Sequence, residues 1–289
     1  MESNKAQQEK LYSHVKFLTE LRPYRNYRNL ESLEKVCKYI ESAFEECRLE
    51  HERQTWTAAG QQFNNVIATY NKHKKKRLII GAHYDVCGDQ PGADDNASAV
   101  AGLLETARMV AANKPDLDYR IDFVAFCLEE PPFFASDEMG SYIHAKSLHN
   151  QQADVIGMIC YEMIGFFIDA PNSQPYPIAE WAKIYPNKAN FIVVVGVSKY
   201  RNFNDKIYRM MTQESEIDVQ VIHFPEENGL ASMSDQRSYW RFGYPALMIN
   251  DTAFIRNPNY HQKSDDIGTL DFDKMTAVVD SAYKAITGF

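Results

Sequence analysis

The sequence predicts an α/β fold, a three-layer sandwich in which helices flank a mixed, mostly parallel central sheet. Short apolar runs rich in β-branched residues alternate with segments whose apolar residues recur at helical spacing. That alternation is typical of a largely parallel sheet covered by helices. Several runs end directly at histidine or carboxylate side chains. Because parallel strands bring their carboxyl ends to one edge, the pattern also predicts a site at that edge.

The amino-acid composition is typical of a globular protein with a large hydrophobic core. The 289 residues are 45% hydrophobic and 24% charged, with a formal net charge of −8. That charge argues against nucleic acid or an anionic membrane as the main partner. The longest β-branched run, residues 191–197, is too short to span a bilayer.

Two features bear on the compartment. Residues 1–10 lack the apolar segment of a signal peptide, so we expect a cytoplasmic protein. A secreted or periplasmic protein whose signal had been removed would look the same. The five cysteines are odd in number, scattered, and without a Cys-x-x-Cys pair, which favours a reducing compartment.

The N-terminal part predicts a helix followed by a strand. Asn29 can cap a helix whose apolar side chains recur every three or four residues. Residues 65–70 predict a strand, and the basic stretch 71–77 predicts a solvated turn rather than a phosphate site. The apolar positions of the helix are Leu33, Val36, Cys37, Ile40 and Phe44.

The rest of the chain alternates between buried strands and helices. Apolar residues at helical spacing over residues 96–110 predict a second helix, and Asp271 can cap a last one. At least seven strands are expected in all. Beyond residues 65–70 they occupy residues 77–83, 121–128, 155–161, 191–197, 219–224 and 245–250.

Metal-seeking side chains stand in five separated clusters, each at or just past the end of an apolar run. Isolated acids and histidines are usually solvated. A set at successive strand ends, with the nitrogen and oxygen donors that zinc takes, predicts a metal site instead. The clusters are His83 with Asp85, Asp94 with Asp95, Glu129 with Glu130, Glu162, and His261.

Each of the first two clusters has an alternative. His83 and Asp85 stand two apart and point the same way on an extended strand, so His83 can bind metal while Asp85 fixes its ring. Taken alone, the pair also fits an ordinary loop histidine. Asp94 and Asp95 follow a Pro-Gly turn and precede a helix. One of them bridging two cations explains the pair better than capping by Asp95 or Asn96.

The third cluster is the sharpest local signal. Glu129 and Glu130 directly follow an apolar strand and precede two prolines, so they cannot continue the sheet. Adjacent residues can face opposite ways, so one glutamate can bind metal while the other handles a proton of the attacking water. Glu162 again ends a strand, and His261 lies in a loop rich in Asn, Pro and Asp.

These segments resemble the zinc-dependent aminopeptidases of the M28 type. The resemblance covers roughly residues 65–289, with the motifs in the family's order. They are Gly-Ala-His-Tyr-Asp (81–85), Gly-Ala-Asp-Asp-Asn-Ala-Ser (92–98), Leu-Glu-Glu (128–130), Tyr-Glu-Met-Ile-Gly (161–165), Gly-Tyr-Pro-Ala-Leu-Met-Ile-Asn-Asp-Thr (243–252) and Arg-Asn-Pro-Asn-Tyr-His-Gln-Lys-Ser-Asp (256–265).

The resemblance implies one or two zinc ions per chain. His83 would bind one zinc, Asp94 would bridge both, and Glu130 and His261 would bind the other. The family usually has Asp where this chain has Glu162. The longer arm reaches further, so we expect the site of His83, Asp94 and Glu162 to hold its ion more weakly.

The resemblance also implies catalytic roles. Asp85 would orient His83, Glu129 would be the general base, and Tyr260 would steady the oxyanion. The segment 131–141 is longer than the family's usual link. Its Phe133 and Phe134 are expected either to wall the specificity pocket or to belong to a plain surface loop.

The function expected from the resemblance is hydrolysis of the N-terminal peptide bond of peptides with a free N-terminus. One metallopeptidase domain would span residues 1–289, with N-terminal helices within 1–60 packing on the part that bears the motifs, 65–289. A glutaminyl cyclase, a transferase on the same fold, and a non-catalytic relative without metal are the alternatives. The Gly-Ala-Asp-Asp-Asn segment favours the peptidase over the cyclase, and Glu129, Glu130 and His261 argue against the non-catalytic relative.

Overall fold

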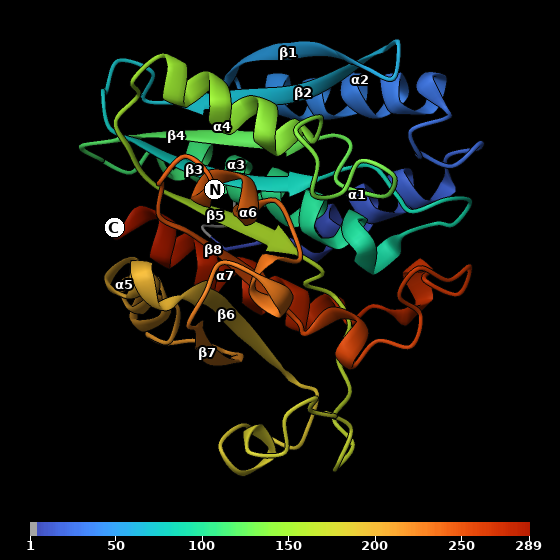
Figure 1. Ribbon diagram of the computed structural model, residues 1–289, viewed down its shortest axis with the longest axis vertical. Coiled ribbons are helices and arrows are strands. Elements are labelled where there is room, and N and C mark those ends of the chain that lie inside the picture. Colours follow the sequence, from blue (N-terminus) through green and yellow to red (C-terminus); the bar gives the residue numbers. More distant parts are fainter. Residues whose placement is uncertain (1–4) are drawn as a thin grey trace.

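The computed structural model describes residues 5–289, and within them eight strands form one sheet (Figure 1). The strand order is β1-β2-β4-β3-β5-β8-β6-β7. Neighbours in the centre, β4-β3-β5-β8, run parallel, as do β6 and β7, whereas β1, β2 and the β6-β8 pair are antiparallel. The strands are β1 (Glu50–Ala58), β2 (Gln61–Tyr70), β3 (Arg77–His83), β4 (Arg120–Phe126), β5 (Val155–Glu162), β6 (Phe191–Val197), β7 (Asp218–Phe224) and β8 (Ala246–Asn250).

Helices cover both faces of this sheet, which confirms the predicted fold class. In Figure 1, α4 and α6 lie in front of the sheet, and the longer helices lie behind it. The two faces bury separate apolar clusters, one including α4 and α6 and the other including the remaining α-helices. The helices are α1 (Gln8–Glu20), α2 (Leu30–Glu46), α3 (Ala99–Asn113), α4 (Gly140–Asn150), α5 (Arg201–Met211), α6 (Gln236–Trp240) and α7 (Phe272–Thr287).

The element boundaries follow from local chemistry. Strand β3 is buried along almost its whole length, as expected of a central strand between two helical layers. Helix α7 begins after Asp271, whose carboxylate accepts the backbone N–H of Lys274 at 3.0 Å. Asn29 precedes α2 as predicted, but its amide donates to the Tyr24 carbonyl instead of capping the helix.

Two elements differ from the expectation. Strand β1, which pairs with β2 at the antiparallel edge, was not predicted, because its polar and charged residues leave it half exposed. The helix expected from residue 96 becomes regular only at Ala99, since the backbone at Asp95 and Asn96 is not helical.

The structure also bears on the cysteines and on membrane insertion. All five cysteines are free, in agreement with their scattered positions. Within residues 5–289, none of the helices combines the length and the apolar character that crossing a bilayer requires.

Candidate metal centre

The carboxyl ends of three adjacent strands and two loops bring six side chains together. Strand β3 lies between β4 and β5, so residues that end or follow these strands meet at one edge. Loop 84–98 before α3 and loop 256–266 before α7 close the site from the other side. The six residues are His83, Asp95, Glu129, Glu130, Glu162 and His261.

Asp95 lies between the two histidines. Its Oδ1 is 3.5 Å from His83 Nε2, and its Oδ2 is 3.1 Å from His261 Nε2. This corrects the sequence prediction, which gave the bridging position to Asp94. The corrected geometry defines two sets of donors that share Asp95. We call His83, Asp95 and Glu162 the first site, and Asp95, Glu130 and His261 the second site.

Asp94 points away from the histidines into a separate network. Its Oδ1 accepts the backbone N–H of Gly165 at 2.9 Å, and its Oδ2 accepts the Asn257 amide at 2.8 Å. Burial, and then the nearby carboxyl of Asp251, raise the pKa of Asp94 well above its ordinary value. Asp94 therefore joins loops beneath the site, and its side chain is already occupied there.

The turn that presents Asp95 is held by a glycine and by another aspartate. Gly92 has φ +59°, and a Cβ there would lie 2.3 Å from the Asp95 carbonyl oxygen, so only glycine fits. Asp265 accepts the backbone N–H of Asp94 at 2.9 Å and of Asp95 at 3.1 Å. Asp265 lies within the motif of residues 256–265, but no pattern in the sequence indicates this contact.

A buried arginine ties the same turn to the N-terminal part of the chain. Arg25 is fully buried, and its guanidinium donates to the carbonyls of Tyr84 at 2.8 Å, of Gly92 at 2.7 Å and of Pro91. Burial lowers the pKa of Arg25 to about 10. The side chain thus links the loop after β3 to the turn before Asp95.

Asp85 fixes the loop that carries the two glutamates. Its carboxylate accepts the backbone N–H of Glu129 at 3.2 Å and of Glu130 at 3.1 Å. Toward His83 it offers mainly its backbone, since His83 Nδ1 lies 3.2 Å from the Asp85 carbonyl oxygen and 3.6 Å from its Oδ1. The role predicted for Asp85, orientation of His83, stays a prediction, and its carboxylate holds the loop after β4.

Left-handed backbone conformations surround the donors. Leu128, just before Glu129, has φ +64°; Met163, just after Glu162, has φ +47°; and His261 itself has φ +56°. Such conformations cost of order 1–3 kcal/mol for a side-chain-bearing residue and cluster at functional sites. The strain is an independent reason to regard this edge of the sheet as functional.

Glu162 reaches the first site with its longer arm. Its Oε2 lies 3.3 Å from His83 Nε2, and the same oxygen accepts the Ser234 hydroxyl at 2.6 Å and the Asn96 amide at 3.2 Å. Ser234 and Asn96 were not singled out from the sequence. Ser234 and Asn96 donate to the same Glu162 oxygen that faces His83. A cation at the first site would therefore bind an oxygen that already accepts two hydrogen bonds.

Tyr260 lies beside the second site. Its ring stacks on that of His261, with centroids 3.8 Å apart and planes 17° apart. Burial, followed by the charges of Asp95 and Glu130, raises the pKa of Tyr260 well above its ordinary value, so the hydroxyl stays protonated. Tyr260 can therefore donate a hydrogen bond toward the space in front of the carboxylates.

The donor atoms fit a divalent cation. Among the buried atoms without a hydrogen-bond partner within residues 5–289, four belong to these side chains: His83 Nε2, Asp95 Oδ2, Glu130 Oε1 and His261 Nε2. Buried polar atoms without partners are rare in folded proteins unless an ion or water satisfies them. Zinc–ligand bonds of about 2.0–2.1 Å place tetrahedral donors about 3.3 Å apart. The separations of 3.1–3.5 Å around Asp95 match that value.

Burial dominates the electrostatics of the carboxylates. It raises the pKa of Glu130 to about 8 and that of Glu129 well above its ordinary value. Burial acts on Asp95 in the same direction, but the adjacent imidazoles of His261 and His83 bring its pKa below the ordinary value. So many buried acids around two histidines need positive charge to remain ionised together.

An apolar pocket opens beside the first site. Glu162 and Tyr260 lie in its wall, and the remainder of the lining is largely aromatic and aliphatic. It comes from β6, β7, β8, the loop 170–190 and the segment 252–255. The apolar lining includes Trp181, Tyr185, Phe191, Val195, Phe224 and Met248.

The long segment after Glu130 does not contribute to that pocket. Phe133 is buried and packs edge-on against Tyr27 and near Phe63, in the core. Phe134 lies under the guanidinium of Arg237, with 4.9 Å from the guanidinium carbon to the ring centroid. Neither aromatic residue lines the pocket, so the first of the two expected roles is wrong, and the buried Phe133 does not fit a plain surface loop either.

Comparison with protein-family models identifies the family of the chain. The model for peptidase family M28 matches residues 65–286. The chain belongs to peptidase family M28. An uncharacterized protein of Escherichia coli (strain K12), YfbL, is 38% identical over 283 residues, which are 95% of this chain and 86% of that protein. Leucine aminopeptidase 1 of Chaetomium globosum is 25% identical over 88% of this M28 chain and 60% of its own length.

The fold also occurs in a solved glutaminyl cyclase. The Bacteroides thetaiotaomicron enzyme, bound to N-acetylhistamine, is similar with a TM-score of 0.74 over 99% of both chains, at 19% identity. At that identity the likeness shows the fold alone. Other relatives of this M28 chain are named leucine aminopeptidases, and its fold also occurs in a glutaminyl cyclase.

Proposed function

We propose that the chain is a metal-dependent aminopeptidase that holds one or two zinc ions and works as one domain over residues 1–289. The observation that carries the proposal is the convergence of unpartnered buried atoms from His83, Asp95, Glu130 and His261. Family membership and the leucine aminopeptidase relatives support the same activity. In this proposal Asp95 replaces Asp94 as the shared ligand, and Glu162 completes the first site.

The residues of the chain divide the work of hydrolysis. When bound, zinc supplies Lewis acidity, which lowers the pKa of a water to about 7 and polarises a carbonyl. Glu129 lies at the edge of the donor set, with its Oε2 3.7 Å from His83 Nε2. We assign it the general base that takes the proton of the attacking water and passes it to the leaving amine. Tyr260 donates its hydroxyl proton in a hydrogen bond to the oxyanion.

The surroundings favour a peptide with a free N-terminus and an apolar first side chain. The buried carboxylates attract a protonated α-amine, and Glu162 lies where the donor set meets the apolar pocket. The aromatic and aliphatic lining suits a large apolar side chain, since such pockets gain from excluding water. An N-acetylated peptide offers no such amine and is expected to be a poor substrate.

A panel of aminoacyl-anilides tests the proposal. We expect cleavage of leucyl and other large apolar derivatives, loss of activity on treatment with a chelator, and its return with zinc. N-acetylated derivatives serve as the matched control. Full activity in the metal-free protein, or equal cleavage of blocked and free substrates, would contradict the proposal.

A cyclase reaction is the second candidate, because the glutaminyl cyclase shares the fold over the full length. A peptide with N-terminal glutamine separates the two reactions. A cyclase closes the glutamine onto its own amine and releases ammonia with the chain otherwise intact, whereas an aminopeptidase releases the first residue. Ammonia release without cleavage would replace the peptidase with the cyclase. Zinc binding without either reaction would indicate a binding protein.

A further inference from the structure

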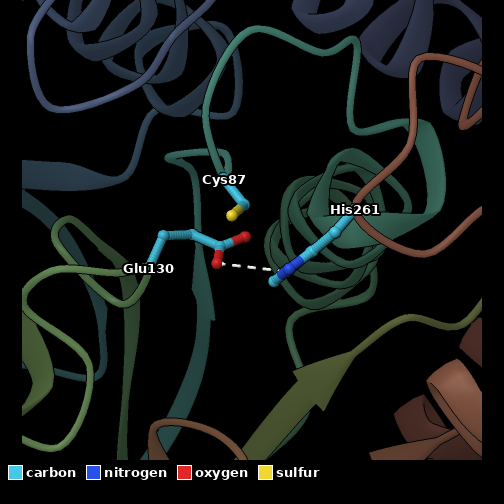
Figure 2. A group of neighbouring side chains, drawn as sticks. All are labelled: Cys87, Glu130 and His261. Atoms are coloured by element: carbon cyan, nitrogen blue, oxygen red, sulfur yellow. Dashed lines mark ion pairs between the residues drawn. The ribbon is translucent and has the colours of Figure 1, made fainter.

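We propose that the Sγ atom of Cys87 is a further ligand of the second site, beside Asp95, Glu130 and His261. The inference rests on the metal-dependent function proposed above. Figure 2 shows the side chains of Cys87, Glu130 and His261 directed toward a common point from three different loops. No part of the sequence motif requires a thiol at this position.

The distances permit one ion to touch all three side chains. One donor atom each from Cys87, Glu130 and His261 lies within 4.8 Å of the other two. In a tetrahedral zinc site with bonds of about 2.3 Å to sulfur and 2.0–2.1 Å to nitrogen, these atoms are about 3.5 Å apart. The sulfur must therefore move by little more than about 1 Å when the ion binds.

Independent evidence for an ion at this point comes from the neighbouring side chains. Glu130 is only 4% exposed, and its Oε1 has no hydrogen-bond partner within residues 5–289. Asp95 Oδ2 and His261 Nε2, 3.1 Å apart, are also without hydrogen-bond partners in the described chain. An ion there would satisfy the unpartnered atoms of Glu130 and His261, the two side chains that the thiol faces.

The loop that carries Cys87 is anchored on both sides. The backbone N–H of Val86 donates to the Arg25 carbonyl at 3.3 Å, and the Asn26 amide donates to the Gly88 carbonyl at 2.7 Å. Cys87 itself is half-buried between these two anchors. Its side chain is therefore presented toward the site by a held backbone, not by a free loop tip.

A thiolate changes what the second site can do. With Cys87, the second site has four protein ligands, the closed arrangement typical of tightly held zinc. The first site, with His83, Asp95 and Glu162, then keeps an open position for water and substrate. A soft sulfur ligand also favours zinc or cobalt over magnesium or manganese.

Cobalt substitution tests the proposal with a readout other than activity. Purified protein is freed of metal, loaded with Co²⁺, and its cobalt content is measured alongside its absorption spectrum. We expect a thiolate-to-cobalt charge-transfer band in the near ultraviolet that is lost in Cys87→Ser. Cys47→Ser is the matched control, because Cys47 is equally half-buried but lies at the end of α2, and it should keep the band.

The outcomes separate this inference from the proposed function. Cobalt bound without the band, or a band that persists in Cys87→Ser, overturns the ligand role of Cys87 and leaves the metal-dependent function standing. Failure to bind cobalt or zinc at all overturns both. Loss of the ligand should also weaken zinc binding by at least about tenfold in Cys87→Ser, the lower end of what loss of a supporting partner costs.

Alkylation gives a second, independent measurement on the wild-type chain. Iodoacetamide reacts with thiolates that are free of metal, and mass spectrometry reports each cysteine separately. Zinc should slow the labelling of Cys87 and leave the labelling of Cys47 unchanged. Equal labelling of Cys87 with and without bound zinc contradicts the proposal.

Discussion

Asp85 Oδ2 accepts the backbone N–H of Glu130 at 3.1 Å, so the loop after β3 fixes the loop after β4. Its Oδ1 accepts the neighbouring N–H of Glu129. One carboxylate therefore sets the direction of both glutamates. The metal donors of two strands are positioned as a unit through this contact.

Removal of the Asp85 carboxylate should weaken zinc binding at the second site. Asp85→Ala is expected to weaken zinc binding by about 10–100-fold, the usual effect of losing a partner that orients a ligand. Asp85→Asn keeps one acceptor oxygen and should fall between Ala and the wild type. Competition with a chromogenic chelator measures the affinity. Unchanged affinity in Asp85→Ala would show that the loop holds its shape without the carboxylate.

Glu129 is expected to move a proton without holding the metal. Glu129→Gln should keep full zinc content and lower kcat by on the order of 10²–10⁴, the usual contribution of a positioned base. Steady-state kinetics with metal analysis measures both quantities. Glu130→Gln is the comparison and should lose zinc. If Glu129→Gln loses the metal instead, the two roles are exchanged.

The two adjacent aspartates should respond in opposite ways. Asp95→Asn removes the carboxylate shared by both sites and should abolish tight zinc binding. Asp94→Asn should retain zinc but lower thermal stability by about 1–3 kcal/mol, because an amide N–H₂ must face the Gly165 N–H or the Asn257 amide. Metal analysis and thermal unfolding of both variants check this. Loss of zinc only in Asp94→Asn would restore the original assignment.

Two metal ions should leave in separable steps. The first site shares its Glu162 oxygen with Ser234 and Asn96, so its ion should be released first. His83→Ala should eliminate the weaker step, and His261→Ala the tighter one. Stepwise titration with a chelator resolves the two affinities. A single step for both ions in the wild type would show that the longer side chain of Glu162 does not weaken metal binding at the first site.

The apolar pocket should set the preference for the first residue. Val195→Phe narrows the pocket and should lower kcat/KM for leucyl substrates relative to alanyl ones by about 10–200-fold, the range for a filled apolar subsite. Comparison of the two substrates in one variant controls for any loss of folded protein. An unchanged ratio would mean that the first side chain binds elsewhere.

The sequence was sufficient for seven of the eight strands and for most of the side chains that meet at the candidate centre. Apolar runs that stop at His83 and Glu162 predict strand ends, because the change from buried to polar residues occurs where the strand leaves the sheet. The N-terminal cap of α7 at Asp271 is also predicted from the sequence. The exposed strand β1 was missed, since its polar and charged residues carry no clear sign of a buried face.

The choice between Asp94 and Asp95 was beyond the sequence. Neighbouring residues point in different directions, and which of them faces the histidines depends on the turn at Asp95, where φ is −103° and ψ is 89°. That turn is set by contacts with Gly92 and with Asp265, 170 residues further along the chain. Long-range contacts of this kind leave no periodic pattern.

The buried guanidinium of Arg25 bears on where the chain can be shortened. The family match begins at residue 65, and a fragment cut to that boundary would keep all six side chains of the centre. It would also lose the guanidinium that donates hydrogen bonds to the carbonyls of Tyr84, Pro91 and Gly92. The loop between α1 and α2 is therefore part of the scaffold of the site, and we expect a fragment that begins at residue 65 to hold its ligands less well in place.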